Sequence, residues 1–309
     1  MKTQRPKRDL VEIFGYAPDD MSTACRSLWT LGACPFTEAP CVKTNHDKTV
    51  VYGVCSVTTK YGDCVVCPNR LYADGKAVLK RVAQDAFGSL PFYSYQEFVR
   101  RRDVAEPCVV ALGINSGNEV RVPQLGSMDW VLARIEELKL TEYTGIEVQS
   151  VDVTGNYRDA WHAYRRLEEG DVVPSSEHGM NWANVYKRLI PQILRKSLVY
   201  SRSSLVKNGL NFIAPEIVYQ RFEDVIGADI PQVKEKGPDV ITVYTYSLGE
   251  IVSEGRIRKL EETRKIRFKF RDFAERVVSG PNLPTSEDLD GAVARALGVE
   301  KALTSGDNA

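Results

Sequence analysis

The sequence has no excess of charge of either sign. Its 309 residues include 41 lysines and arginines and 41 aspartates and glutamates. A balanced charge neither indicates nor excludes a polyanionic partner, so only local clusters of basic side chains can indicate one. The remaining composition, 43% hydrophobic and 27% charged residues, is typical of a globular protein.

Long apolar runs are also missing. No uninterrupted hydrophobic stretch is long enough to cross a bilayer. The first residues, "MKTQRPKRDLVEIFGYAP", are basic but lack the apolar centre of a signal peptide. We therefore expect a cytoplasmic protein with no membrane partner.

The pattern along the chain predicts an α/β protein in three parts. Residues 1–103 contain cysteine-rich turns and short β-like runs, followed by helical stretches. Residues 104–280 alternate β-branched runs such as "CVVALGI" and "DVITVYTYSL" with segments of helical spacing such as "NVYKRLIPQILRKSLVY". This alternation predicts a mixed sheet flanked by helices. For residues 281–309 we expect a short helix and a flexible polar tail.

Acidic residues with the spacing of a metal site lie on one predicted strand and just before another. Asp129 lies in "SMDW", and Glu147 and Gln149 lie in "GIEVQSVD". Alternate residues of a strand share a face, so Glu147 and Gln149 point the same way. Carboxylates are the ligands with which Mg²⁺ supports phosphodiester hydrolysis, but glutamine cannot accept a proton. The residues alone leave two interpretations: a metal-dependent nuclease site, or a half-exposed strand with polar side chains facing solvent.

Six of the seven cysteines lie between Cys25 and Cys67. In a reducing cytoplasm such clustering favours a metal site over disulfides. Cys64 and Cys67 have the two-residue spacing of a metal knuckle, but the other spacings are irregular. Spacing therefore does not fix the ligands, and buried free thiols remain the alternative.

Three stretches together resemble the NotI-type restriction endonucleases, and the short chain is most similar to the EagI-like members. They are "GACPF" with "CVK", "YGVCSV" and "VVCPNR"; "SMDWVLARIE" with "GIEVQSVDVTGNYRDAWHAY"; and "NVYKRLIPQILRKSLVYSRS". The resemblance covers about residues 30–205 and implies a variant PD-(D/E)XK nuclease core with a small N-terminal domain that binds a metal through four cysteines. It also implies bacterial restriction–modification, with a cognate methyltransferase as functional partner.

The resemblance implies a role for each acidic residue. Asp129 and Glu147 would bind the catalytic Mg²⁺, and Gln149 would take the place of the usual catalytic lysine. Glu119, in "GNEVRV", corresponds to a further active-site glutamate, although its distance from Asp129 in the sequence differs from the family pattern. Asp152 also matches a family aspartate, and its role stays open.

The resemblance further implies a structural iron bound by four cysteines, with zinc as the alternative. The matching residues are Cys34, Cys41, Cys55 and Cys67. Four thiolates suit either metal and leave no open position for chemistry. Cys64 has no counterpart in the family, and Cys25 and Cys108 would be buried thiols.

Basic clusters supply the candidate contacts to double-stranded DNA. Arginine recognises guanine, and acidic side chains accept from cytosine, so a GC-rich site favours these residue types. The candidates are Asn156, Arg158, Asp159, Lys187 and Arg188. Arg195 and Lys196 extend the second cluster, and "RKIRFKFR" forms another, although alternating charge also protects an edge strand from aggregation. Solvated helix faces and ion pairs remain the alternative for each residue.

The function that these expectations describe is that of a homodimeric type II restriction endonuclease. It would cleave a GC-rich palindrome, CGGCCG or a site containing it, and leave 5′ overhangs, because a two-fold dimer matches a two-fold site. Two alternatives stay open: a repair-type PD-(D/E)XK nuclease of other specificity, and a catalytically dead, metal-stabilised DNA-binding protein.

Overall fold

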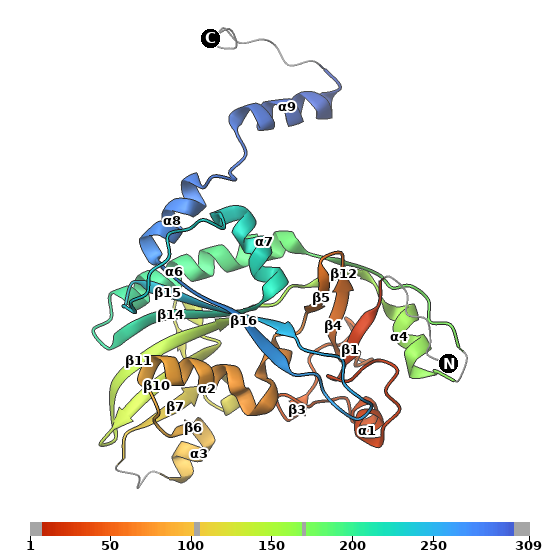
Figure 1. Ribbon diagram of the computed structural model, residues 1–309, viewed down its shortest axis with the longest axis horizontal. Coiled ribbons are helices and arrows are strands. Elements are labelled where there is room, and N and C mark those ends of the chain that lie inside the picture. The colour runs from red at the N-terminus through yellow and green to blue at the C-terminus, as the bar shows by residue number, and fades with distance from the viewer. Residues whose placement is uncertain (1–7, 102–105, 169–170, 300–309) are drawn as a thin grey trace.

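A seven-stranded mixed sheet forms the centre of the computed structural model, which describes residues 8–101, 106–168 and 171–299 (Figure 1). The strand order is β16-β15-β14-β11-β10-β7-β6. The strands are β6 (Phe92–Ser94), β7 (Cys108–Leu112), β10 (Trp130–Glu136), β11 (Lys139–Val148), β14 (Val206–Pro215), β15 (Val240–Leu248) and β16 (Leu260–Lys269). The predicted α/β class and mixed sheet are confirmed.

The directions of the strands determine which strand ends lie beside one another. Strands β10 and β11 form an antiparallel pair, whereas β11, β14 and β15 run parallel. Strand β14 is buried along nearly its whole length, as expected for a central strand covered on both faces. The edge strand β16 pairs antiparallel with β15.

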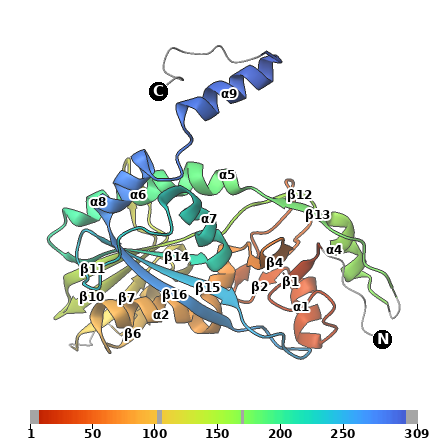
Figure 2. The ribbon, with the colours of Figure 1, turned by 45° about the horizontal axis from the view of Figure 1, so that its top comes forward.

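Helices cover both faces of this sheet (Figures 1 and 2). Helix α2 (Ala73–Phe87) covers one face, and α6 (Ile190–Ser201), α7 (Glu216–Ile226) and α8 (Phe270–Ser279) cover the other. Neighbouring residues of one strand enter different cores: Phe212 packs on the α7 side and Ile213 on the α2 side. Every helix within the described ranges is too short or too polar to span a bilayer.

The N-terminal part forms a small sheet of its own, in the order β1-β4-β5. Its elements are β1 (Leu10–Ile13), α1 (Thr23–Leu31), β2 (Ala33–Cys34), β3 (Ala39–Pro40), β4 (Val54–Thr59), β5 (Gly62–Val65) and the 3-10 helix η1 (Pro68–Tyr72). Arg70 connects it to the main sheet: its Nε lies 2.9 Å from Oε2 of Glu12, and its Nη2 donates to the Arg258 carbonyl at 2.5 Å. Helix α2 and strand β6 precede the predicted boundary at residue 103, yet both belong to the central layers.

The remaining elements connect these two sheets or lie outside them. They are α3 (Tyr95–Arg100), η2 (Ile114–Ser116), β8 (Arg121–Val122), β9 (Gly126–Ser127), β12 (Val153–Asn156), α4 (Arg158–Arg165), β13 (Glu177–Met180), α5 (Trp182–Asn184), the π-helical turn η3 (Val185–Leu189) and α9 (Ser286–Leu297). Helix α4 packs on the N-terminal part through Trp161, whose Nε1 donates to the Tyr52 carbonyl at 2.8 Å. Helix α9, the expected C-terminal helix, projects away from the body in both views (Figures 1 and 2). The expected tail at residues 300–309 lies outside the described residues.

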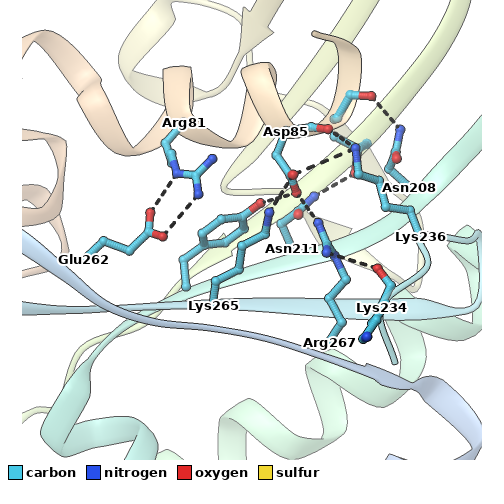
Figure 3. A network of polar contacts seen from close by, with 12 residues as sticks. Arg81, Asp85, Asn208, Asn211, Lys234, Lys236, Glu262, Lys265 and Arg267 are labelled. Atoms are coloured by element: carbon cyan, nitrogen blue, oxygen red, sulfur yellow. Dashed lines mark hydrogen bonds and ion pairs between the residues drawn. The ribbon is translucent and has the colours of Figure 1, made fainter. Parts of the chain in front are cut away.

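A polar network holds α2 against the last two strands (Figure 3). The Asp85 carboxylate accepts from Lys265 at 2.5 Å, from Arg267 at 2.7 Å and from the Tyr244 hydroxyl at 2.7 Å. Burial by itself raises the pKa of Asp85, but these hydrogen bonds outweigh it and hold the pKa well below the usual carboxyl range. Arg267 is therefore committed to an internal contact, and Lys269 pairs with Asp239 at 3.0 Å. These contacts support the ion-pair interpretation of the basic residues on this edge strand.

We predict that Asp85→Asn destabilises the fold by about 2 kcal/mol at pH 7, because it leaves clustered cations without their carboxylate. A depressed carboxyl pKa stabilises the fold above the ordinary carboxyl pKa and loses that effect as the pH falls further. Urea unfolding should therefore show a difference from wild type that shrinks below about pH 4. Asp239→Asn is the control, because its exposed ion pair should contribute under about 1 kcal/mol. Equal unfolding midpoints for wild type and Asp85→Asn at pH 7 would contradict the prediction.

Candidate active site

The antiparallel pairing of β10 and β11 brings Asp129 and Glu147 together. Trp130 at the start of β10 pairs with Ile146 near the end of β11, so the residues one step beyond, Asp129 and Glu147, lie opposite each other. The Val148 amide donates to Oδ2 of Asp129 at 2.9 Å, which fixes the carboxylate across the strand ends. Two acids far apart in the sequence thus converge at one end of the central hairpin.

Glu147 is buried, with 4% of the residue exposed. Burial, and after it the nearby Asp129 charge, raises its pKa to about 7 against the opposing effect of Lys196. The pKa of Asp129 is raised as well, although the residue is exposed at the surface and the Val148 amide acts in the other direction. A buried carboxylate beside an exposed one that repels it is an arrangement that a divalent cation stabilises.

The two carboxylate oxygens of Glu147 have different surroundings. Nζ of Lys196, from helix α6, lies 2.6 Å from Oε2. Among the described residues, Oε1 is buried and has no hydrogen-bond partner. A buried polar atom of this kind normally has a partner, so Oε1 is an available ligand atom.

Lys196 is a site residue that sequence reasoning missed. Its basic neighbours in the sequence suggest an exposed DNA contact, but the residue is only 3% exposed, so the structure does not support a surface role. The signal was its position in the apolar stripe of α6, where Ile193, Ser197 and Tyr200 are also buried. A lysine on such a stripe requires a buried anionic partner.

Gln149 and Glu119 lie at the same end of the hairpin. Gln149 directly follows β11 and is half-buried, and its Nε2 donates to the Ser150 carbonyl at 2.6 Å. The Glu119 charge contributes to the raised pKa of Asp129. Asp129 and Glu147 thus lie opposite each other, and within the described residues no third acidic, histidine or cysteine side chain lies close enough to form a metal site with them.

Asp152 has a structural contact instead of a place beside the acids. Its Oδ2 accepts from Nδ2 of Asn184 at 3.3 Å, and its carbonyl accepts from the Asn181 amide at 2.9 Å. These bonds join the segment after β11 to the start of α5.

The five candidate DNA contacts are all exposed. Asn156 lies two residues before the first residue of α4, and its Oδ1 accepts from the Arg158 amide at 2.8 Å. Lys187 and Arg188 lie on the π-helical turn that leads into α6. The structure thus places these two basic side chains on the same continuous helical segment as Lys196.

The cysteines separate into two groups. Burial, with smaller contributions from the neighbouring thiols of Cys67 and Cys34, raises the pKa of Cys41 to about 11. Burial likewise raises the pKa of Cys55, with Cys67 and Cys41 again among its neighbours. The four residues that the resemblance selects therefore gather in one place, whereas for Cys64 burial and Asp63 alone raise the pKa.

Backbone hydrogen bonds oppose the effect of burial at this cluster, but burial outweighs them, so the pKa of Cys41 and Cys67 is raised. Lys43 provides one to Cys41, and Asn69 and Arg70 provide two to Cys67. Such bonds stabilise the charged form of sulfur, which is the metal-binding form. As they stand, no three histidine, cysteine, aspartate or glutamate side chains of the described residues are grouped closely enough to hold a metal ion. The donor set thus fits a soft metal in its chemistry but not in its present spacing.

In the comparisons with known proteins, no family model and no curated protein matches the chain.

The cysteine cluster gives a prediction with a matched control. We expect purified protein to contain about one iron or zinc per chain. Cys67→Ser should lower this metal content and the thermal stability, because it removes a ligand, whereas Cys64→Ser should retain both. Elemental mass spectrometry and thermal melting measure the two effects. Metal loss from Cys64→Ser but not from Cys67→Ser would overturn the ligand set.

Proposed function

We propose that this protein is a Mg²⁺-dependent type II restriction endonuclease with a variant PD-(D/E)XK core. The observation that carries the proposal is the convergence of Asp129 and Glu147 at the end of the central hairpin, with Oε1 of Glu147 buried and unpartnered among the described residues. A single pair of carboxylates with free oxygen atoms is the protein ligand set that Mg²⁺ uses at phosphoryl-transfer sites.

Each residue has a defined part in the proposed reaction. Asp129 and Glu147 would hold the ion, which when bound would polarise the scissile phosphate and lower the pKa of water. Gln149 would orient water or a phosphate oxygen by hydrogen bonding, since an amide cannot act as a base. Glu119, an exposed residue whose charge contributes to the raised pKa of Asp129, would add negative charge at the rim of the site.

Exposed polar residues would place DNA against this site. Lys187 and Arg188 lie on the helical segment that continues into α6, so phosphate contacts there would align the backbone with the acids. Asn156, Arg158 and Asp159 would read base edges, because arginine and aspartate suit G·C pairs. A homodimer would present two such sites to the two strands of a CGGCCG-containing palindrome and leave 5′ overhangs.

The cysteine cluster would hold iron, with zinc as the alternative, in a structural role. Cys34, Cys41, Cys55 and Cys67 would enclose the ion, which would stabilise the small N-terminal sheet. Cys67 and the adjoining helix η1, which carries Arg70, would transmit that stability to the main sheet.

Cleavage of a plasmid with a single CGGCCG site tests the proposal. Wild type with Mg²⁺ should give a linear product, and Glu147→Ala should lower the rate by about 100-fold or more, because it removes a metal ligand. Glu136→Ala is the control: it removes an acid from β10 whose partner is the partly exposed Arg134.

The pattern of products separates the alternatives. Discrete fragments of genomic DNA, with no cut at CGGCCG, would keep the nuclease and replace the site. A smear would indicate a nuclease without sequence specificity, and a gel shift without cutting would indicate a DNA-binding protein. Equal activity of Glu147→Ala and wild type would reject the proposed active site.

A further inference from the structure

A buried ammonium group lies in a site whose catalytic strand supplies none. Nζ of Lys196 lies 2.6 Å from Oε2 of Glu147 and donates to the Ser127 carbonyl at 2.8 Å. Ser127 lies two residues before Asp129. Lys196 therefore contacts both segments that carry the proposed metal ligands, and it does so from a helix distant in the sequence.

The helix that carries Lys196 has an irregular start that sets its orientation. The π-helical turn Val185–Leu189 precedes α6 directly, and Pro191 lies in the first turn of α6. A π turn holds more residues than an α turn, so it rotates every later side chain about the helix axis. With this phase Ile193, Lys196 and Tyr200 all face the sheet.

A second contact joins α6 to the segment before Asp129. Arg195 donates to the Gln124 carbonyl. Gln124 and Ser127 belong to the short hairpin of β8 and β9 that precedes Asp129. Two consecutive side chains of α6 thus hold this hairpin, one from the surface and one from the interior.

The pair is costly to bury. Transfer of an ammonium and a carboxylate from water to the interior carries a desolvation penalty that apolar residues of similar volume would avoid. Lys196 and Glu147 have side chains that are 4% and 5% exposed. A stable fold alone does not require such a pair at this position, whereas an oriented carboxylate does.

We propose that Lys196 is a positioning residue of the metal site: its ammonium group binds Oε2 of Glu147 and the Ser127 carbonyl, and so directs Oε1 toward the ion held with Asp129. This inference rests on the proposed function. It also assigns to a helix the cation that the catalytic strand does not supply to the site, because Gln149 stands where the wider PD-(D/E)XK class has a lysine.

Four variants test this role: Lys196→Met, which keeps the length and removes the charge; Gln149→Lys; the double variant; and Lys139→Met as the control. Lys139 is an exposed lysine at the other end of β11, outside the proposed site. Lys196→Gln keeps a hydrogen-bond donor and serves if Lys196→Met does not fold. Thermal melting identifies the variants that are folded.

The primary measurement is Mn²⁺ binding to the DNA-free protein by titration calorimetry. Lys196→Met should bind the ion about 10- to 100-fold more weakly, since loss of a residue that orients a ligand has effects of this size. The double variant should recover part of this loss, because the ammonium group introduced by Gln149→Lys would approach Glu147 from the same face of the strand. Lys139→Met should bind as wild type does. Unchanged or tighter binding by Lys196→Met, or no recovery in the double variant, would overturn the inference.

Plasmid cleavage by the same variants separates this inference from the proposed function. If wild type cuts DNA and Lys196→Met cuts equally well, the positioning role fails and the nuclease stands. If wild type cuts nothing, the nuclease fails, and calorimetry still decides whether Lys196 organises a cation site at Glu147.

Discussion

The buried ion pair between Glu147 and Lys196 is the interaction on which the architecture of the site depends. One partner lies near the end of a central strand and the other on the helix that covers it, so the pair fixes the helix against the sheet in one position. Three other features of the fold must be in place for this ion pair to form. The hairpin must align Asp129 with Glu147, the π turn must orient α6, and the β8–β9 hairpin must reach the same ammonium group.

The strands at Asp129 and Glu147 were accessible from the sequence, but their antiparallel pairing and the partner of Glu147 were not. Strand periodicity predicts that Glu147 and Gln149 share a face, and it predicts the buried runs of β7, β11 and β15. Periodicity along one element cannot show which element packs against it. Lys196 lies in an arginine- and lysine-rich stretch that has the composition of a solvated face, and only tertiary packing shows that it points inward. A pattern with a fixed period likewise cannot predict that a π turn rotates the side chains that follow it.

The cysteines also show that a sequence pattern does not predict which side chains lie together in the fold. By spacing alone, Cys64 and Cys67 are the natural pair. Cys64 lies on β5 and Cys67 lies just after it, however, and the two thiols have different surroundings. Cys67 is the N-cap residue of the 3-10 helix η1 and has Cys41 and Cys55 as neighbours, whereas the Cys64 thiol donates to the Val65 carbonyl at 3.6 Å. The direction of the backbone after the strand, which no spacing rule contains, decides which thiol has other thiols around it.

Local charge pairing decides which cations of this neutral chain are buried and which stay exposed. Asp85 binds Lys265 and Arg267 and is close to Lys236, so one internal carboxylate engages three cations of the sheet and its connecting loop. Lys196 is likewise neutralised within the site. Each of these pairs neutralises cations with a carboxylate, mainly on the α2 face and inside the site. The paired cations therefore do not contribute to the charge that the surface presents. Lys187 and Arg188 remain exposed on the helical segment that supplies Lys196, so the same segment directs one charge toward the acids and two toward solvent. The π turn thus sets the direction of Lys196 relative to Lys187 and Arg188, so the position of Glu147 depends on the helical segment that carries all three side chains.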